Sequence, residues 1–309
     1  MDSKLNISVS PHILCPTTTK RIMLDVVIAL LPAVIAGTLL FGLRALLVVA
    51  LCVAICLLTE FLFNVVIKAK QTIGDLSAVV TGVLLGLNLP ANIPLWQAAI
   101  GSIFAILVVK CIFGGIGKNL FNPAIAARVF MLIAFGAMAT PAFPTLDTIS
   151  TATPLVVLKE GGFAPPLVDL FLGIRGGAIG ETCVLALIIG GVYLLIRRVI
   201  TWHIPVAFIA TTFILTFVLV DFDIYTALSS IMSGGLFIGA IFMATDYTTS
   251  PSSDLGKLVF GIFAGLMTVL IRFWGVYPEG VSFAILFANI LDPYIEVWTK
   301  RRLFGGYKK

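Results

Sequence analysis

The chain has 309 residues, of which 60% are hydrophobic and 11% are charged, and its mean hydropathy is +1.12. Soluble domains carry about 25% charged residues, so this composition excludes an ordinary soluble protein, a disordered chain, a collagen and a disulfide scaffold. The formal charge is +5, from 20 Lys and Arg against 15 Asp and Glu. These basic residues are spread over short loops and not gathered on one amphipathic face, so the charge does not indicate nucleic-acid binding.

Apolar runs long enough to cross a bilayer recur along the whole chain. A transmembrane helix needs about 20 mostly apolar residues, and this criterion predicts ten spans, at 22–41, 43–67, 75–89, 93–113, 122–139, 182–200, 204–220, 226–244, 255–274 and 279–298. The sequence therefore predicts an all-α, polytopic membrane protein. Its expected parts are an N-terminal extension (1–20), a first membrane repeat (21–140), a loop (141–181), a second repeat (182–299) and a basic tail (300–309).

The distribution of Lys and Arg predicts the orientation of these spans. Ten spans put both termini on one side, and an excess of basic residues in short loops marks the cytoplasm. With the N-terminus inside, sixteen of the twenty basic residues fall on the cytoplasmic side, Lys110 and Arg128 among them. Arg44, Lys159, Arg175 and Arg272 fall outside. The longest loop, about 139–181, is then extracytoplasmic.

The third and eighth predicted spans, 75–89 and 226–244, are short or interrupted by glycine. They occupy matching places in two halves of five spans, and an odd number of spans per half forces the second half to enter the membrane upside down. Such inverted repeats bring broken helices together near the midplane, where they line a site. The alternative is that these glycines only allow close helix packing.

Neither the cysteines nor the histidines suggest a metal site. No Cys-x-x-Cys pair occurs, although two cysteines share a helix face at i and i+4, and the histidines have no partner at ligand spacing. The residues concerned are Cys15, Cys52, Cys56, Cys111, Cys183, His12 and His203. Buried free cysteines in apolar helices are the simpler interpretation.

Four acidic residues, Asp25, Glu60, Asp292 and Glu296, lie toward the predicted cytoplasmic ends of spans. A charge within a span must be paired or must face water. Snorkelling or a local pair with Lys or Arg explains such positions. The alternative is an ion path, for which Asp25 and Glu60 are the better candidates.

Asp246 differs from these four because it follows the glycine-rich eighth span, among hydroxyl residues in Met-Ala-Thr-Asp-Tyr-Thr-Thr-Ser-Pro (243–251). Such a group can hold a sugar-like hydroxyl, a ring nitrogen or a small cation through oxygen ligands. The alternative is an ordinary helix cap.

The predicted outer loop contains Asp-Thr-Ile-Ser-Thr-Ala-Thr-Pro-Leu (147–155). Small hydroxyl residues before proline are typical of a turn, with Asp147 as its cap. The Asp-x-x-Ser-x-Ala-Thr pattern, however, resembles the site at which a flavin transferase joins FMN to threonine through a phosphoester bond. An exposed loop outside the membrane is what such an enzyme needs.

Three motifs in this order, Gly-Gly-Ile-Gly-Lys-Asn-Leu-Phe-Asn-Pro-Ala (114–124), 147–155 and 243–251, give a resemblance that covers almost the whole chain. The chain resembles the RnfD family, the D subunits of the Rnf complexes. These complexes are membrane ferredoxin:NAD oxidoreductases. It is similar to the B subunits of the sodium-pumping NADH:quinone oxidoreductases, but only about twenty residues precede the first span, which favours the Rnf family.

The resemblance implies that Thr153 carries covalent FMN and that Asp147, Ser150 and Ala152 form the recognition motif. One departure is Thr151, where many members have glycine, so a second hydroxyl could compete as the acceptor.

The resemblance also implies a noncovalent flavin, often riboflavin, between the helices. Asn119, Asn122, Asp246 and Thr248 are the candidate residues for this second flavin.

The implied function is electron transfer between ferredoxin and NAD coupled to export of Na⁺ or H⁺ across a prokaryotic cell membrane. The expected partners are the A, B, C, E and G subunits of Rnf, a flavin transferase and the bilayer, and no nucleic acid. Two alternatives remain, a urea-channel-like solute channel or transporter, and a structural subunit without a cofactor. Flavin on Thr153 would distinguish the electron-transfer function from both of these alternatives.

Overall fold

The computed structural model describes residues 18–135, 142, 153–159, 162, 166–277 and 279–299. Asp147, Ser150, Thr151 and Ala152 of the predicted recognition motif lie outside these ranges, as do His12 and Cys15. The described residues fold into helices and connecting loops, and the only β-contact among them is an isolated bridge between Ala142 and Gly177.

The first five predicted spans correspond to one group of helices. These are α1 (Thr19–Phe41), α2 (Leu43–Val66), the short 3₁₀ turn η1 (Ile73–Asp75) with α3 (Ser77–Leu87), α4 (Leu95–Ile103) with its π-helical continuation η2 (Phe104–Cys111), and α5 (Pro123–Ala134).

Two short helices, α6 (Pro154–Lys159) and α7 (Leu167–Leu172), precede the second group. That group comprises α8 (Val184–Ile196), α9 (His203–Leu219), α10 (Ile224–Met232), α11 (Leu236–Ile238) with the π-helical η4 (Gly239–Met243), α12 (Asp254–Trp274) and α13 (Val281–Thr299).

Every predicted span contains a helix, so the prediction of a polytopic helical membrane protein is confirmed. Within the described ranges, α1, α2, α12 and α13 are long and apolar enough to cross a bilayer. The eighth span is broken by a 63° bend between α10 and α11–η4, and the third, α3, has only 11 residues. Two further spans are shorter than predicted: α5 ends at Ala134, and α8 has 13 residues.

Local chemistry explains both breaks. The helix α3 ends at Leu87, shortly before Pro90, because proline lacks an N–H and restricts the residue before it. Between α10 and α11, Gly234 has φ +69°, a left-handed conformation that glycine adopts without a steric penalty. Each break leaves backbone carbonyls that need partners inside the bundle.

The two groups repeat one packing pattern. In the first group the second and fourth spans pack together, that is α2 with α4 and η2. In the second group the seventh and ninth spans do so, that is α9 with α12. Across the groups, α1 packs on α8 and α5 packs on α13. Because a two-fold axis places equivalent elements against one another, this is the pattern of an inverted repeat.

Glycine also serves close packing within a half. A Cβ on Gly82 would lie 2.6 Å from the Cα of Val53, and one on Gly86 would lie 2.8 Å from the Cα of Val49. Both interpretations of the glycine pattern therefore hold.

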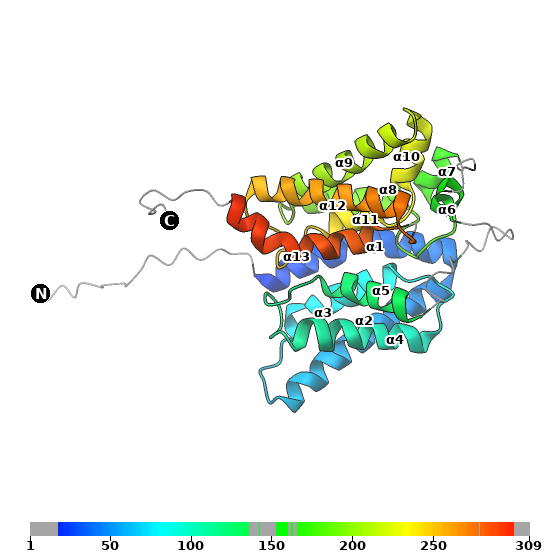
Figure 1. Ribbon diagram of the computed structural model, residues 1–309. Helices are drawn as coiled ribbons and strands as arrows, with labels where there is room; N and C mark the ends of the chain where they lie inside the picture. The colour runs from blue at the N-terminus through cyan, green and yellow to red at the C-terminus, as the bar shows by residue number, and fades with distance from the viewer. Residues whose placement is uncertain are drawn as a thin grey trace, which may run out of the picture.

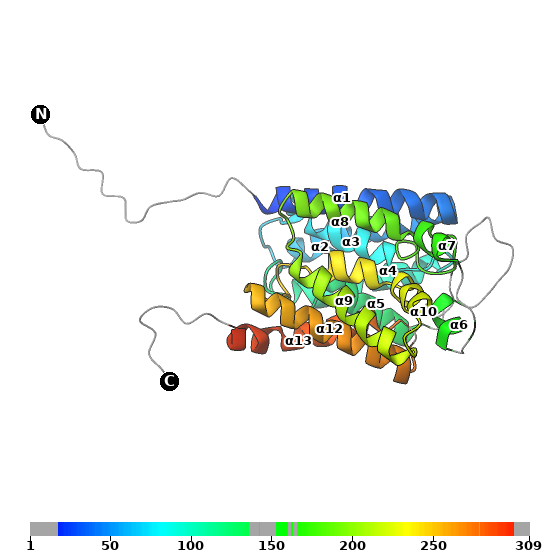
Figure 2. The same ribbon diagram turned by 90° about the horizontal axis from the view of Figure 1, so that it is seen from above.

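The helices form one bundle whose two ends differ (Figures 1 and 2). The start of α1 and the end of α13 lie at one end, which we call the inner end, and α6 and α7 lie at the other, the outer end. Large apolar side chains cover the outside, among them Leu43 at 78%, Val66 at 79% and Trp298 at 80% exposure. Such a surface is stable against lipid and not against water.

Candidate functional site

A cavity of about 70 Å³ opens at the inner end of the bundle, between α1, α3, the loop before α5 and the segment after η4. It is lined by Ile22, Met23, Val26, Ser77, Val80, Thr81, Leu84, Lys110, Ile116, Asn119, Asn122, Pro123, Leu194, Val199, Ile200, Phe242, Thr245, Asp246, Tyr247 and Thr248. The four residues predicted for a noncovalent flavin therefore lie together, although each asparagine is at least 124 positions from Asp246 and Thr248 in the sequence.

The polar side of this inner cavity is a connected set of amide, carboxylate and hydroxyl groups. The Asn119 amide donates to Thr248 Oγ1 over 3.4 Å, and that hydroxyl donates to Asp246 Oδ2 over 3.2 Å. Loss of contact with water raises the pKa of the Asp246 carboxyl above its usual value, while hydrogen bonds from Thr248 oppose this shift.

The neighbouring asparagine, Asn122, fixes the local backbone. Its Oδ1 caps α5 by accepting from the Ala124 N–H over 3.0 Å, and its amide donates to the Met243 carbonyl over 3.2 Å. Asn119 Oδ1 is buried without a hydrogen-bond partner among the described residues. A buried acceptor that lacks a partner favours a bound donor such as a ring N–H or a sugar-like hydroxyl.

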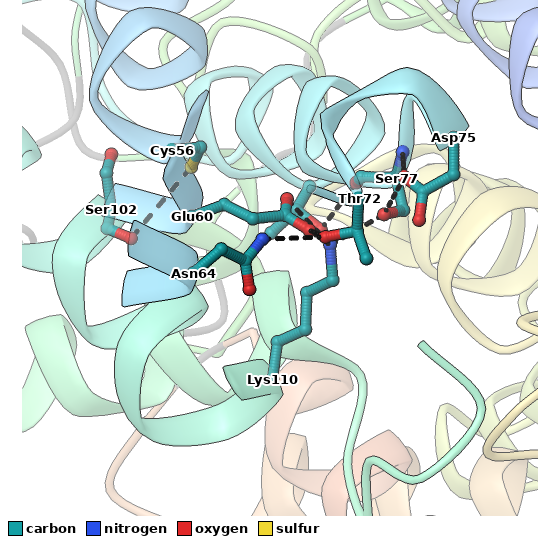
Figure 3. A network of polar contacts seen from close by, with 9 residues as sticks. Cys56, Glu60, Asn64, Thr72, Asp75, Ser77, Ser102 and Lys110 are labelled. Atoms are coloured by element: carbon teal, nitrogen blue, oxygen red, sulfur yellow. Dashed lines mark hydrogen bonds and ion pairs between the residues drawn. The ribbon is translucent and has the colours of Figure 1, made fainter. Parts of the chain in front are cut away.

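A buried ion pair borders the inner cavity, between Glu60 of α2 and Lys110 of η2 (Figure 3). Lys110 Nζ lies 2.9 Å from each Glu60 carboxylate oxygen and 2.6 Å from Ser77 Oγ. The Thr72 hydroxyl donates to Glu60 over 2.5 Å and accepts from the Asn64 amide over 3.0 Å. The carboxylate of Glu60 thus has a counter-ion and a hydroxyl donor, as the local-pair interpretation predicts.

Asp25 is also paired, with Arg197 directly after α8, at 3.2 Å, and it accepts a hydrogen bond from the hydroxyl of Tyr193 in α8 over 3.0 Å. This contact joins the first span of each half. Glu296 accepts from the backbone N–H of Ser252 over 3.3 Å. Local contacts therefore account for Asp25, Glu60 and Glu296. The fourth acid, Asp292, has its Oδ1 buried without a hydrogen-bond partner among the described residues, and the ion path stays a prediction.

Thr153 lies at the outer end, directly before α6, and Pro154 takes the first helical position, where proline is favoured. It lines a small pocket of about 10 Å³. The other lining residues are Pro154, Leu155, Arg175, Gly176, Gly177, Glu181, Thr182, Gly234 and Glu279.

An ionic cluster of Arg128, Arg175, Glu181, Arg272 and Glu279 surrounds this outer pocket. Arg128 forms ion pairs with Glu181 and Glu279 and donates to Asn88 Oδ1, at the end of α3, over 2.5 Å.

Arg272 binds the other broken helix. Its guanidinium donates to the carbonyls of Ser230 over 2.8 Å and Ser233 over 3.2 Å, directly before the α10–α11 break, and to the Glu279 carbonyl over 3.2 Å. The ionic cluster therefore holds both helix breaks.

Sequence patterns alone do not reveal this cluster, and they misplace Arg128. The positive-inside rule counts Arg128 as a cytoplasmic charge, but its side chain is buried and pairs with Glu279 in the loop before α13. Lys110, which the rule also counts as cytoplasmic, does lie at the inner end, where its side chain is buried against Glu60. The signal that could have found them is an arginine or lysine within an apolar span, which requires a partner.

The cysteines and histidine that are described make no recognisable metal site. Cys52, Cys56, Cys111 and Cys183 are free thiols, and within the described ranges no three His, Cys, Asp or Glu side chains converge. His203 stacks on Trp202 with a centroid separation of 4.2 Å.

Comparison with known proteins matches this chain over nearly its full length. Residues 6–305 match the NQR2, RnfD, RnfE family. The chain is 47% identical to the D subunit of the Na⁺-translocating ferredoxin:NAD⁺ oxidoreductase complex of Acetobacterium woodii, over 98% of this chain and 96% of that protein. It is 39% identical to the proton-translocating counterpart of Clostridium ljungdahlii, over 97% of this chain and 96% of that protein.

A third relative, the D subunit of the ion-translocating oxidoreductase complex of Aliivibrio salmonicida, is 34% identical over 98% of this chain and 99% of that protein. Both the family match and these identities span the two helical groups and the loop between them. The chain belongs to the NQR2, RnfD, RnfE family.

Proposed function

We propose that this chain is the D-type membrane subunit of a complex that couples electron transfer between ferredoxin and NAD to translocation of Na⁺ or H⁺. The relatives at 47% and 39% identity carry this activity in their names and are covered almost end to end. The complex implies partner subunits, which we take to be the A, B, C, E and G subunits. The solute-channel alternative has no support among these relatives.

Within that complex, the chain carries FMN as a phosphoester on Thr153. The observation that carries this proposal is the position of Thr153, partly exposed at the start of α6, at the end of the bundle opposite the start of α1. A hydroxyl in this position is open to a modifying enzyme and lies beside a charged pocket. When bound, the flavin would supply the redox chemistry, while the chain fixes its place.

A second, noncovalent flavin would occupy the inner cavity. Its lining combines a few polar groups with apolar walls, as small-molecule sites do. Asn119, Asn122, Asp246 and Thr248 would meet the polar edge of the ring and the ribityl hydroxyls. The apolar walls, from residues such as Leu84 and Phe242, would exclude water from the ring.

We place the outer end on the extracytoplasmic side, because the tail 300–309, which follows the inner end of α13, alone holds five Lys and Arg. The basic residues described at the outer end are Arg44, Arg128, Lys159, Arg175 and Arg272, and Arg128 is neutralised there by Glu181 and Glu279. A flavin on Thr153 and a flavin in the inner cavity would then lie toward opposite faces of the membrane. The helices between them would separate the two redox groups.

Peptide mass spectrometry tests the covalent site. The chain is coexpressed with its flavin transferase, denatured and compared with Thr153→Ala and with Thr151→Ala, which removes the competing hydroxyl. We expect an FMN-sized mass increase on the peptide that contains Thr153, in the wild type and in Thr151→Ala but not in Thr153→Ala. An unmodified wild-type peptide, from cells whose transferase modifies another substrate, would contradict the proposal.

The flavin released on denaturation tests the inner cavity. We expect wild type and Asp254→Asn, a change at an exposed carboxylate, to release one noncovalent flavin, and Asp246→Asn to release at least tenfold less. Equal release from all three would remove this cavity as the site.

A further inference from the structure

A second cavity lies at the outer end, between α6, the end of α9, α10 and the end of α12, where α6 packs against α10 (Figure 2). We call it the α6–α10 cavity, and its lining includes Leu155, Leu158, Lys159, Thr216, Leu219 and Phe273. We propose that the isoalloxazine ring of the flavin on Thr153 binds in this cavity. The inference rests on the proposed attachment of FMN to that threonine, and it adds the place that the ring takes on the helix bundle.

The first argument is size. The outer pocket beside Thr153 has about 10 Å³, which is room for one water molecule and not for a flavin ring. The α6–α10 cavity has about 330 Å³, within the roughly 300–1,000 Å³ of sites that enclose a small molecule. Of these two spaces at the outer end, the α6–α10 cavity is the one with room for a tricyclic ring.

The second argument is the distance from Thr153. Its carbonyl accepts from the N–H groups of Val156 and Val157, so Thr153 directly adjoins α6. A helix rises about 1.5 Å per residue, which places Leu155 and Lys159 about 3 and 9 Å along the axis from Thr153. An extended ribityl phosphate spans such a distance, so a ring tethered to Thr153 is within reach of the cavity.

The third argument is an unpaired polar group in the lining. Thr216 of α9 is 1% exposed, and its Oγ1 is buried without a hydrogen-bond partner among the described residues. A buried hydroxyl of this kind favours a ligand with a polar edge. The carbonyl oxygens and ring nitrogens of an isoalloxazine form such an edge, whereas the acyl chain of a lipid would leave Thr216 unpaired.

The remaining lining suits the other parts of the ring. Lys159 Nζ donates to the Gly275 carbonyl over 2.5 Å, which uses one of the three donors of an ammonium group and leaves donors for a ring carbonyl. Leu158 and Phe273 supply apolar surface for the ring faces. The cavity therefore combines an apolar slot with a few polar groups, as ligand sites do.

A thiol introduced into the cavity tests the inference. Leu158→Cys is purified in detergent with and without coexpressed transferase, and peptide mass spectrometry first measures the flavin on Thr153. Both preparations are then treated with a small maleimide. Because the ring would cover this position, we expect the introduced thiol to react at least tenfold more slowly in the chains that carry flavin.

A matched control separates this protection from a general effect of the flavin on the outer end. Val168→Cys places a thiol on α7, at a position that is 65% exposed and does not line the cavity. It should react at the same rate with and without flavin.

A second change tests the hydroxyl of Thr216. Adding Thr216→Val to Leu158→Cys removes one hydrogen bond to the ring, and should speed labelling of the flavin-bearing chain about fivefold. Thr212→Val is the control, because this hydroxyl donates to the Phe208 carbonyl of its own helix over 2.9 Å. It should leave the protection unchanged.

The outcomes are distinct. If the thiol of Leu158→Cys reacts equally with and without flavin, the ring lies elsewhere and the inference is wrong, while the flavin detected on Thr153 still supports the proposed function. If Thr216→Val and Thr212→Val change the protection equally, Thr216 does not bind the ring. If no flavin is attached although the transferase is active, the proposed function fails at Thr153 and this inference fails with it.

Discussion

Each half of the bundle sends one basic side chain from the end of its fourth span to its broken third span. At the inner end, Lys110 of η2 donates to Ser77 Oγ, at the start of α3, over 2.6 Å. At the outer end, Arg272 of α12 donates to Ser230 Oγ, in α10, over 3.3 Å. The inverted repeat therefore extends to single side chains.

The two ends differ in what else these cations meet. Lys110 has a carboxylate, Glu60, so its charge is balanced where it lies. Arg272 meets carbonyl and hydroxyl oxygens of its half, and the carboxylates nearby are bound by Arg128. One half thus pairs its cation with a carboxylate, while the other holds its cation with carbonyl and hydroxyl oxygens.

Removing Arg128 should have the largest effect on stability. Arg128→Met leaves Glu181 and Glu279 without their shared counter-ion, and loss of one partner from a buried ion pair costs about 3–5 kcal/mol. We expect the free energy of unfolding to fall by at least this much, measured by thermal or denaturant unfolding of the purified protein in detergent.

The control adds Glu181→Gln to Arg128→Met, which removes one of the two uncompensated charges and should restore part of the stability. A stable single variant would mean that the ionic cluster does not hold the two helix breaks.

The inner pair gives a sharper version of the same experiment. Lys110→Met leaves one buried carboxylate, so we expect a loss near the lower end of about 3–5 kcal/mol. The double variant Lys110→Met with Glu60→Gln should recover most of it, because no charge then remains unpaired. Lys257→Met removes a lysine whose pair with Asp254 is exposed and should change stability by less than about 1 kcal/mol.

If the double variant were no more stable than Lys110→Met alone, Glu60 would not be the group that balances the charge of Lys110. The contrast between the two ends would then be lost.

The fold was largely predictable because it depends on local patterns. Apolar runs of about 20 residues predict spans, and both breaks coincide with proline or glycine, at Pro90 and Gly234. The four residues of the inner cavity were also predictable, but through motifs that the resemblance brings together. Their contacts, such as Asn119 with Thr248, join positions 129 apart.

The ionic cluster was not predictable for the same reason. Arg128 and Glu279 are 151 positions apart, and only the inverted packing of the two halves brings them together. The positive-inside rule counts charges by their loop and cannot tell a buried partner from a cytoplasmic one. It therefore assigns Arg128 to the wrong environment and counts Arg175 and Arg272 as ordinary loop charges.

The pair between Asp25 and Arg197 should give the smallest effect and tests the remaining ion-path hypothesis. Arg197 is 38% exposed in its side chain, so solvent screens the interaction, and Asp25→Asn should lower the Tm by roughly 2 °C or less. Because Asn keeps the shape of the side chain and can still accept from Tyr193, we expect ion transport by the reconstituted complex to stay unchanged.

Arg197→Met is the matched control, since it removes the same pair from the other side. Transport could be lost in Asp25→Asn but kept in Arg197→Met, with the Tm unchanged in both. That result would show that the Asp25 carboxylate itself binds the translocated ion. The pair with Arg197 would then be part of the ion path, as well as a contact between the two halves.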